Sequence, residues 1–462
     1  MQLQKLTNKN QSLLAVMVLM QILWLIGIGV TGASTDRQKL LGLGIYSLVC
    51  GIIVLIPYRI TPHSADLYLR RIFGNHKKLL SVILVTVFAV GVIYAFVQRI
   101  WPWDEEFSFL AARMIAENGL HTFFDNYSQI LWVHNHPPLI ILLNGFALRL
   151  FGSNIIFIRI LSLIFLVGTV LLTYLIALHT SDTQTALLAA IMLPTFPLVY
   201  RLGTAGLLDI QVTFFFTLAV FLLFLLLRKP GYTLAIALSL VISAGLLTKY
   251  TMFFILPVIG AAYLIDWRNW KPVPYLALVG MIVGIIFISW LSFGQKIGLS
   301  VPGFSILQHL QKNVSRNVTQ DNQEAILPPP GKVENISVGW YLTTKEGIVE
   351  LTNNLGTKLV SAIGPYNVPL IVLGLIFVFR RRLKTDKYLI IWVATVFLLL
   401  VLTLPDHRYF MPIFPALAIM MAIWLKSHPD AIHRAVLLSV LYLGAALYLF
   451  ADWFRAAQLF QK

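Results

Sequence analysis

Three acidic side chains follow one another directly after an apolar stretch of the chain. Asp104, Glu105 and Glu106 come just after the hydrophobic run 79–97. Acids are common in the first turn of a helix, where they complement its dipole, so the cluster has a purely structural explanation. The alternative is catalysis at a membrane face, because a carboxylate can act as a general base toward a hydroxyl group.

A second acid and three cations lie in connectors between later apolar runs. Asp209 begins such a run, where an unpaired carboxylate is costly and a partner or a function is expected. Pairing with Arg201 is the structural explanation. Lys249 and Arg408 also interrupt apolar runs, and cations held there suit an anionic ligand such as a lipid phosphate. Their structural alternative is extension toward lipid headgroups.

Two histidines and two tyrosines complete the candidate substrate-binding residues. His134 and His136 precede a tandem proline. Histidines at this spacing could bind a metal, but a third ligand is missing, so we predict that one of them donates a hydrogen bond to a polar ligand. A headgroup contact is the structural alternative. Tyr250 and Tyr409 directly follow Lys249 and Arg408.

The composition shows what must position these residues. Of the 462 residues, 58% are hydrophobic and only 12% are charged, and the mean hydropathy is +0.81. Soluble domains carry about 25% charged residues, so this is an all-α polytopic membrane protein. The net charge of +16 does not indicate nucleic-acid binding, because Lys and Arg lie mainly in short connectors, as the positive-inside rule requires. The single cysteine, Cys50, excludes an internal disulfide and a cysteine-based zinc site.

The apolar runs predict about thirteen transmembrane helices, the first of them retained because no small-residue cleavage site follows it. The predicted spans are 12–32, 40–58, 79–97, 155–178, 184–200, 207–227, 232–248, 251–266, 274–293, 366–380, 387–404, 409–425 and 434–451.

The run 138–151 decides the topology. It reaches only about 21 Å as a helix, so we expect it to lie on the membrane surface or to re-enter it. The connectors then place most of the Lys and Arg inside, including the triple arginine 380–382, with the N-terminus cytoplasmic and the C-terminus outside. Counting the run as a span would put that triple arginine on the wrong side.

This topology divides the chain into five parts. We predict three N-terminal transmembrane helices in 1–98, a first outer loop with interfacial helices in 99–154, central transmembrane helices in 155–293, a large outer loop in 294–365 and C-terminal transmembrane helices in 366–462. Both loops lie on the outer face, so the active site is expected there.

The first outer loop is predicted to begin with an amphipathic helix that could lie flat on the membrane. The apolar residues that define its face are Phe107, Leu110, Ala111, Met114 and Ile115, and Asn118-Gly119 is expected to end it.

Taken together and in this order, the blocks resemble the GT-C class of integral-membrane glycosyltransferases, which use polyprenyl-phosphate sugars. The similarity, from about 79 to 425, is to protein O-mannosyltransferases and lipid A aminoarabinose transferases. Trp103-Asp104-Glu105 resembles their Asp-Glu motif, and Asp209 matches their second outer acid. The segments 245–251 and 408–415 resemble later blocks. His136-Pro137-Pro138-Leu139 departs from the aminoarabinose enzymes, which carry lysine at the first position.

The resemblance implies a reaction and roles for the site residues. The expected reaction is transfer of a sugar from a polyprenyl-phosphate donor, with inversion, to a lipid, glycan or protein acceptor. Asp104 would be the general base, and Glu105 and Asp209 would orient the acceptor or a divalent metal ion, for which Asp104 and Asp209 are the candidate ligands. The candidates for the phosphate clamp are Lys249, Arg408, Arg201 and His136.

Localisation and the rival function also follow from this interpretation. The expected membrane is the plasma membrane in a prokaryote and the endoplasmic reticulum in a eukaryote. The rival function is a transporter or flippase of a lipid-linked or small polar substrate. Transporters tend to place ionisable groups near the bilayer midplane, whereas here they collect at one face.

Overall fold

The computed structural model describes most of the chain between residues 75 and 427. The described residues are 75–101, 103–130, 136–265, 268–297, 345–403, 406–427 and the short helical pieces 437–438, 441–442 and 444–445. They are largely helical and contain no strand, so the predicted all-α membrane fold is confirmed for this part of the chain.

The long helices form where the sequence carries long apolar runs, and polar side chains cap several of their first turns. Asn154 Oδ1 accepts a hydrogen bond from the backbone N–H of Ile156, and Asp182 caps the next helix through the N–H groups of Gln184 and Thr185. Six helices are long and apolar enough to cross a membrane: α4 (His76–Val97), α7 (Ile155–Thr180), α10 (Asp209–Arg228), α13 (Val273–Lys296), α19 (Lys384–Thr403) and η8 with α20 (His407–Ile413, Phe414–Ser427).

Two further spans are broken. The pair formed by α8 (Thr183–Met192) with η4 (Leu193–Thr195) and α9 (Pro197–Gly203) bends by 72°, and the pair formed by Gly347–Ile363 and Pro365–Arg381 bends by 86°. The second pair contains α16 (Lys345–Thr352), the π-helix η6 (Asn353–Leu359), α17 (Val360–Ile363), η7 (Pro365–Asn367) and α18 (Val368–Arg381).

The two breaks are bonded to each other. The backbone carbonyl of Thr195, freed where the first pair bends, accepts hydrogen bonds from the Tyr366 hydroxyl at 2.7 Å and from Asn367 Nδ2 at 3.1 Å. A buried carbonyl without a partner is costly. Two side chains of the second bend therefore satisfy a carbonyl group that the first bend exposes.

Two other predicted spans are shorter than expected. They are α11 (Tyr232–Leu246) and η5 with α12 (Tyr250–Phe254, Ile255–Leu264). With up to eight candidate spans among the described residues, the predicted thirteen are not confirmed. The predicted spans 12–32 and 40–58, and most of 434–451, lie outside the described residues.

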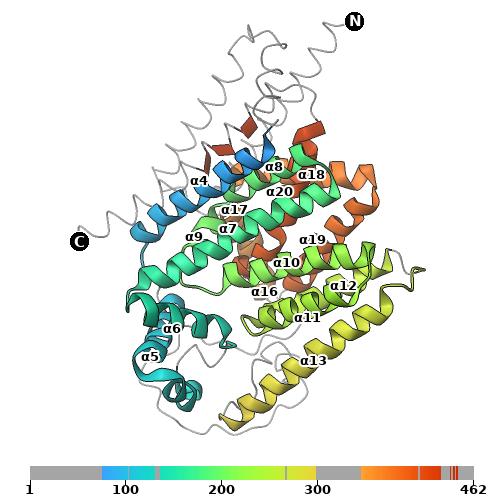
Figure 1. Ribbon diagram of the computed structural model, residues 1–462. Helices are drawn as coiled ribbons and strands as arrows, with labels where there is room; N and C mark the ends of the chain where they lie inside the picture. The colour runs from blue at the N-terminus through green and yellow to red at the C-terminus, as the bar shows by residue number, and fades with distance from the viewer. Residues whose placement is uncertain are drawn as a thin grey trace, which may run out of the picture.

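The spans pack into one bundle around a buried apolar core. Helix α7 packs against α4, α8 and α10, and α20 packs against α8 and α18, while α10, α11 and α13 form a neighbouring group (Figure 1). Stacked rings join the first bent pair to α20, where the ring centroids of Phe196 and Phe414 lie 5.0 Å apart.

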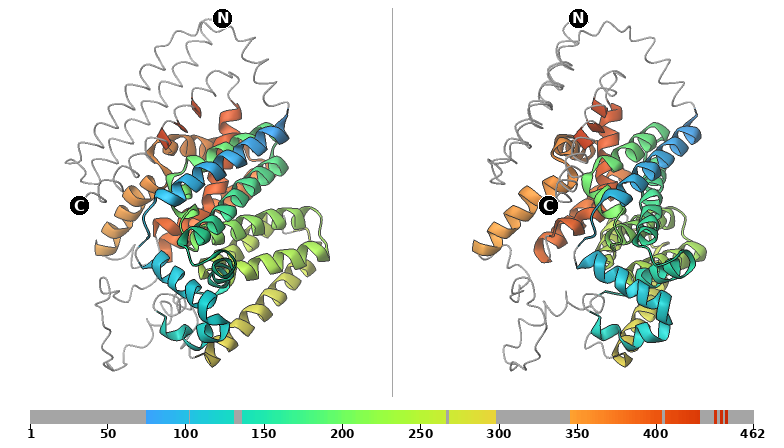
Figure 2. Two further views of the ribbon diagram at one scale, coloured as in Figure 1. Left: turned by 60° about the vertical axis from the view of Figure 1, so that its left-hand side comes forward. Right: turned by 90° about the vertical axis from the view of Figure 1, so that its left-hand side faces the viewer.

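Helices α5 (Asp104–Asp125) and α6 (Leu139–Phe151), joined through η2 (Tyr127–Gln129), lie at one end of this bundle, beside the end of α13, in every view (Figure 2). Helix α6 has 13 residues, shorter than a typical membrane span. Its first N–H donates to the carbonyl of Leu247 at 2.9 Å, which ties this helix pair to the end of α11.

The buried face of α5 differs from the prediction. Leu110 is 47% exposed, and the buried positions are Glu105, Ser108, Ala111, Ala112, Ile115 and Phe123. Ala111 and Ile115 of the predicted apolar face are buried against the bundle, and Glu105 and Ser108 are buried with them. Gly119, with φ of +88°, breaks the helix where its end was expected, but the helix resumes as far as Asp125.

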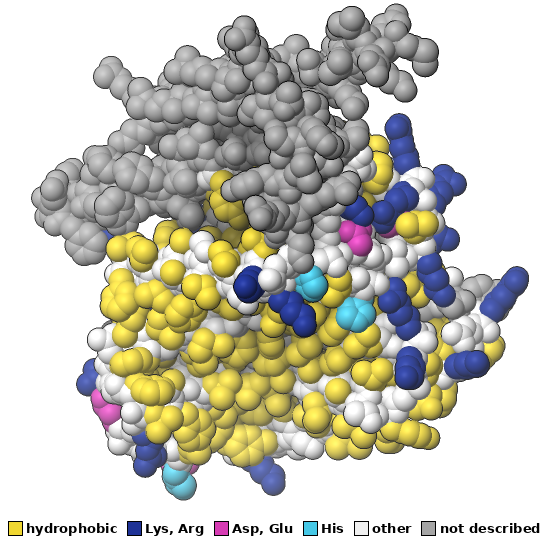
Figure 3. Space-filling model, turned by 45° about the horizontal axis from the view of Figure 1, so that its top comes forward, with side chains coloured by type: hydrophobic (Ala, Val, Ile, Leu, Met, Phe, Trp, Pro, Cys, Tyr) yellow, Lys and Arg dark blue, Asp and Glu magenta, His cyan; other side chains and the backbone are white. Residues whose placement is uncertain are grey.

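Basic residues collect at the bundle end opposite α5 and α6. Helix α10 runs from Asp209 to Arg228, α19 begins at Lys384, and Lys426 lies in the last turn of α20. Figure 3 shows Lys and Arg side chains along the right-hand edge, beside a broad hydrophobic face. A multi-pass membrane protein has this distribution of charge.

Candidate active site

The first pair of site residues joins the start of α10 to the end of α11. Lys249 Nζ lies 2.7 Å from Asp209 Oδ1, and the two side chains are only 9% and 5% exposed. Asp209 also stands in the first turn of α10, where the helix dipole favours a negative charge. The structural alternative for Asp209 named Arg201 as its partner, whereas the ion pair in the structure is with Lys249.

Burial and charge act in opposite directions on Lys249. Burial lowers the pKa of the Lys249 ammonium group, but Asp209 and Tyr409 together raise it, and the pKa of Lys249 lies above its ordinary value. The ion pair with Asp209 thus favours the charged form of Lys249.

The second pair joins α5 to η8. Arg408 Nη1 forms an ion pair with Asp104 Oδ2, and the two side chains are 21% and 23% exposed. Asp104 Oδ1 makes no hydrogen bond to another described residue. This carboxylate is thus reachable, with one oxygen left for a ligand. The residue before it, Trp103, has φ of +67°, an uncommon conformation for a bulky side chain that suggests a constrained helix start.

Asp406 fixes the other side of Arg408. Its Oδ1 accepts from the backbone N–H of Arg408 at 2.9 Å, and its Oδ2 lies 3.7 Å from Arg408 Nε. Burial alone would raise the pKa of Asp406, but His407 and Arg408 dominate and lower it below its ordinary value. The sequence analysis did not select Asp406.

The two pairs belong to one cluster. Lys249 Nζ lies over the ring of Tyr409, 4.5 Å from its centroid, and Tyr409 is the neighbour of Arg408. Such a cation–π contact is worth up to about 2 kcal/mol where water is excluded. Four predicted site residues, from connectors far apart in the sequence, therefore meet at the bundle end that carries α5: Asp104, Asp209, Lys249 and Arg408.

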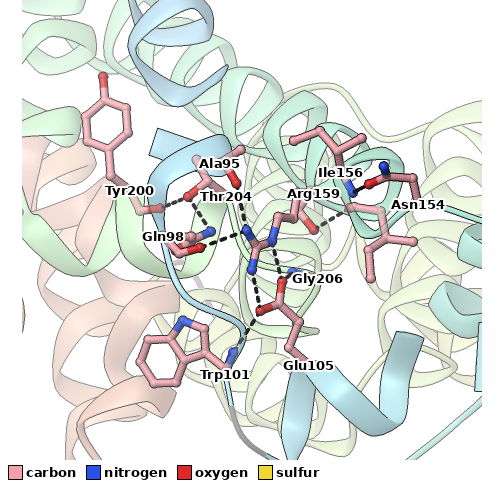
Figure 4. A network of polar contacts seen from close by, with 12 residues as sticks. Ala95, Gln98, Trp101, Glu105, Asn154, Ile156, Arg159, Tyr200, Thr204 and Gly206 are labelled. Carbon is pink, nitrogen blue, oxygen red and sulfur yellow. Dashed lines mark hydrogen bonds and ion pairs between the residues drawn. The ribbon is translucent and has the colours of Figure 1, made fainter. Parts of the chain in front are cut away.

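Glu105 has contacts of another kind. It is fully buried, and Arg159 of α7 donates to both of its oxygens, from Nε to Oε1 at 2.8 Å and from Nη2 to Oε2 at 2.9 Å. The backbone N–H groups of Trp101 and Gly206 complete its shell at 2.9 and 2.8 Å (Figure 4). With four donors around it, this carboxylate has no lone pair left for an acceptor or a metal ion.

The other predicted binding residues lie around the cluster. The Arg201 guanidinium lies 5.5 Å from the centroid of the Trp101 ring. Tyr250 accepts a hydrogen bond from Trp290 Nε1 at 3.2 Å. The backbone carbonyl of His136 accepts one from the Tyr127 hydroxyl, whereas His134 lies outside the described residues.

Arg159 is the main residue that the sequence analysis missed. The signal was that Arg159 is the one charged residue within the predicted span 155–178. An ionisable residue inside a span is expected to have a partner or a function. That partner, Glu105, lies far away in the sequence, so spacing alone gave no indication of the pair.

The cluster does not fit a dedicated metal site. In the described part of the chain, no group of three or more His, Cys, Asp or Glu side chains could hold a metal ion. Of the two candidate ligands, Asp209 is paired with the buried Lys249, and Asp104 offers one free oxygen beside the Arg408 cation, whereas a hard divalent cation needs several oxygen ligands.

The described residues form an all-helical membrane protein with the GT-C fold, which confirms the resemblance found in the sequence. The structure is similar to that of ArnT from Cupriavidus metallidurans, with a TM-score of 0.53 and 16% identity over 75% of this chain and 60% of ArnT. It is also similar to the oligosaccharyltransferase of Archaeoglobus fulgidus, with a TM-score of 0.51 and 14% identity over 81% of this chain and 55% of that chain.

Sequence comparisons also find glycosyltransferases, over a shorter region of the chain. The family described as dolichyl-phosphate-mannose-protein mannosyltransferase matches residues 135–293, a region that contains Asp209 and Lys249. An undecaprenyl phosphate-alpha-4-amino-4-deoxy-L-arabinose arabinosyl transferase of Pseudomonas paraeruginosa is 31% identical over 150 residues. That match covers 30% of this chain and 27% of the relative, so the chain spans little more than a quarter of that protein.

Proposed function

We propose that the protein is an inverting glycosyltransferase that moves a sugar from a polyprenyl-phosphate donor to a hydroxyl or phosphate acceptor on a lipid, glycan or protein. The observation that carries this proposal is the cluster of two carboxylate–cation pairs, Asp104 with Arg408 and Asp209 with Lys249, at one end of the bundle. The relatives support it, since one is an arabinosyl transferase that acts with undecaprenyl phosphate and an ArnT structure contains undecaprenyl phosphate.

Asp104 is the general base of this proposal. Its free oxygen takes the proton of the acceptor hydroxyl, whose oxygen attacks the anomeric carbon and forms the new glycosidic bond. The bond from that carbon to the phosphate oxygen breaks, and its electron pair leaves with the polyprenyl phosphate. Attack opposite the leaving group inverts the anomeric carbon, and phosphate leaves without being protonated first.

Lys249 and Arg408 stabilise the departing phosphate. Each is held by a carboxylate, yet an ammonium group has three donors and a guanidinium has five, so both have donors left for phosphate oxygens. Because the pair formed by Lys249 with Asp209 is nearly buried, its charge acts on developing negative charge at low dielectric, where such stabilisation is largest. Arg201, His136, His134, Tyr250 and Tyr409 are proposed to line the rest of the donor site.

Asp209 orients Lys249 in this proposal, and no step passes through a metal ion. The oligosaccharyltransferase of A. fulgidus has been crystallised with zinc, but the described donor set of this chain does not match such a site.

The cluster is proposed to face the outside of the membrane, with the N-terminus cytoplasmic and the C-terminus outside, in the plasma membrane of a prokaryote or the endoplasmic reticulum of a eukaryote. The basic residues at the opposite end of the bundle support this orientation. A transporter is disfavoured, because Asp104, Asp209, Lys249 and Arg408 lie at helix ends and not near the middle of a span.

The test is sugar transfer by purified protein in detergent, with a panel of labelled undecaprenyl- and dolichyl-phosphate sugars and cell-envelope lipids or proteins as acceptors. Asp104→Asn should lower kcat by about 100- to 10,000-fold. Glu106→Gln, at the exposed neighbouring acid, is the matched control and should be near wild type. Undiminished turnover of Asp104→Asn would refute the base assignment, and substrate movement into liposomes without covalent transfer would indicate a transporter.

A further inference from the structure

The buried pair formed by Glu105 and Arg159 lies next to the catalytic cluster but is closed to any ligand. Arg159 is 3% exposed and Glu105 fully buried. The guanidinium also donates from Nη1 to the backbone carbonyls of Ala95 at 2.7 Å and Gln98 at 3.0 Å. The pair therefore joins the end of α4, the start of α5 and the start of α7 (Figure 4).

Glu105 also reaches the connector that leads into Asp209. The N–H of Gly206 donates to Glu105 Oε1 at 2.8 Å across 101 positions of sequence. This approach requires glycine or a displacement, because a Cβ at Gly206 would lie 2.4 Å from Ile158 Cδ1 and 3.4 Å from Glu105 Cγ. The carboxylate next to Asp104 thus holds the backbone just before Asp209.

A second bridge holds the same connector. Gln98 Nε2 donates to Thr204 Oγ1 at 3.0 Å, while the carbonyl of Gln98 accepts from Arg159. Thr204 Oγ1 in turn donates to the carbonyl of Tyr200 at 2.7 Å. Segment 204–208 is consequently attached at two points to groups that Arg159 organises.

We infer that Glu105 and Arg159 are positioning residues, which fix Asp104 and Asp209 relative to each other by bonding α5 to segment 204–208. This inference rests on the proposed function for its kinetic consequence. Glu105 does not touch substrate or metal, in contrast to the role first expected for it. A displacement of about 1 Å between reacting groups can cost about 100-fold in rate, so rigid attachment of both carboxylates has a direct effect on turnover.

The first arm of the test is kinetic. Glu105→Gln leaves the Arg159 charge buried without its counterion and should lower kcat about 100-fold with little change in KM for the lipid-linked donor. The double variant Glu105→Gln/Arg159→Met removes both charges and should recover about tenfold of that loss, since neutral replacement of a whole buried pair is often tolerated. Glu117→Gln, at the exposed ion pair with Arg113 on the same helix, should leave both parameters unchanged.

The second arm needs no enzymatic activity, so it separates this inference from the proposed function. Hydrogen exchange measured by mass spectrometry on the full chain in detergent should show faster exchange in the peptide containing Gly206 for Glu105→Gln, and to a smaller extent for Gly206→Ala. Asp104→Asn and Glu117→Gln should leave that peptide unchanged.

Two results would overturn the inference. One is unchanged exchange of the Gly206 peptide in Glu105→Gln. The other concerns the double variant. If it turns over no faster than Glu105→Gln although segment 204–208 exchanges as in the wild type, then the Glu105 carboxylate acts on the substrate directly. Absence of sugar transfer in the wild type would refute the proposed function and leave the exchange arm as the test of the positioning contacts.

Discussion

Replacing Lys249 separates its two effects, on structure and on the proposed reaction. Lys249→Met leaves Asp209, 5% exposed, without its ion-pair partner. Breaking a buried pair by removing one partner costs about 3–5 kcal/mol, so the melting temperature in detergent should fall by about 5 °C or more. The same change removes a cation from the departing phosphate, which should lower kcat by about 100- to 1,000-fold, equivalent to about 2.7–4 kcal/mol.

The double variant Asp209→Asn/Lys249→Met distinguishes these effects. With both charges removed, no unpaired charge stays buried, and the melting temperature should return close to wild type. Transfer should stay at least about 100-fold low, because the phosphate has still lost its cation. The double variant of Glu105 and Arg159 differs in this respect, because neutralising both of those partners should recover part of the activity lost in Glu105→Gln.

The assay is transfer of label from a polyprenyl-phosphate sugar, with melting temperature measured on the same preparations. Lys426→Met is the matched control, because Lys426 pairs with Asp182 in the connector before α8 and its side chain is 38% exposed. It should lower the melting temperature only slightly and leave kcat unchanged. Loss of an oxyanion donor costs at least about 100-fold in rate. If the double variant recovers transfer to within about tenfold of wild type, a direct action of Lys249 on the phosphate is refuted.

Further outcomes follow from the same contacts. Arg408→Lys keeps the charge but loses the planar fork that serves Asp104 and Asp406, so steady-state kinetics should show kcat about 10- to 100-fold lower. The pKa of Asp406 is lowered in the folded state, so its contribution to stability is present above its ordinary pKa of about 3.9 and is lost as the pH falls further. The difference in melting temperature between wild type and Asp406→Asn should therefore shrink as the pH is lowered from about 6 to about 3. At Gly364, φ is +79° and a Cβ would lie 2.6 Å from Tyr366 Cζ, so Gly364→Ala should lower stability by about 1–3 kcal/mol in thermal unfolding. Treatment with EDTA should leave turnover unchanged, since the proposed reaction uses no metal ion and no group of three or more His, Cys, Asp or Glu side chains in the described residues could hold one; a loss restored by added metal would contradict this.

Hydropathy was sufficient to predict where the spans lie, but not their shape. The predicted spans within the described residues coincide with helices or bent helix pairs, because a long apolar run has few alternatives to a helix in a membrane. The bends were not predicted. That at Pro197 interrupts the predicted span 184–200, and its stability depends on Tyr366 and Asn367 of a distant segment, which no local pattern contains.

The candidate site was predictable in its residues but not in its pairing. Charges that interrupt apolar runs are few, and the topology put them on one face, which led to Asp209, Lys249 and Arg408. Their partners depend on how α5, α10 and η8 pack. For this reason the structural alternative for Asp209 named Arg201, which is close in sequence, whereas the structure pairs Asp209 with Lys249.

Adjacent acids at a helix start necessarily point in different directions. Successive side chains of an α-helix are about 100° apart, so Asp104 and Glu105 cannot both face the same cleft. The structure gives one to Arg408 with a free oxygen and the other to the buried Arg159. An Asp-Glu motif on a helix therefore requires a division of tasks, in which one carboxylate is available to a ligand and its neighbour fixes the helix that presents it. On this argument Asp104→Glu combined with Glu105→Asp should be inactive although it preserves charge and composition, because each carboxyl group is displaced from its own partner.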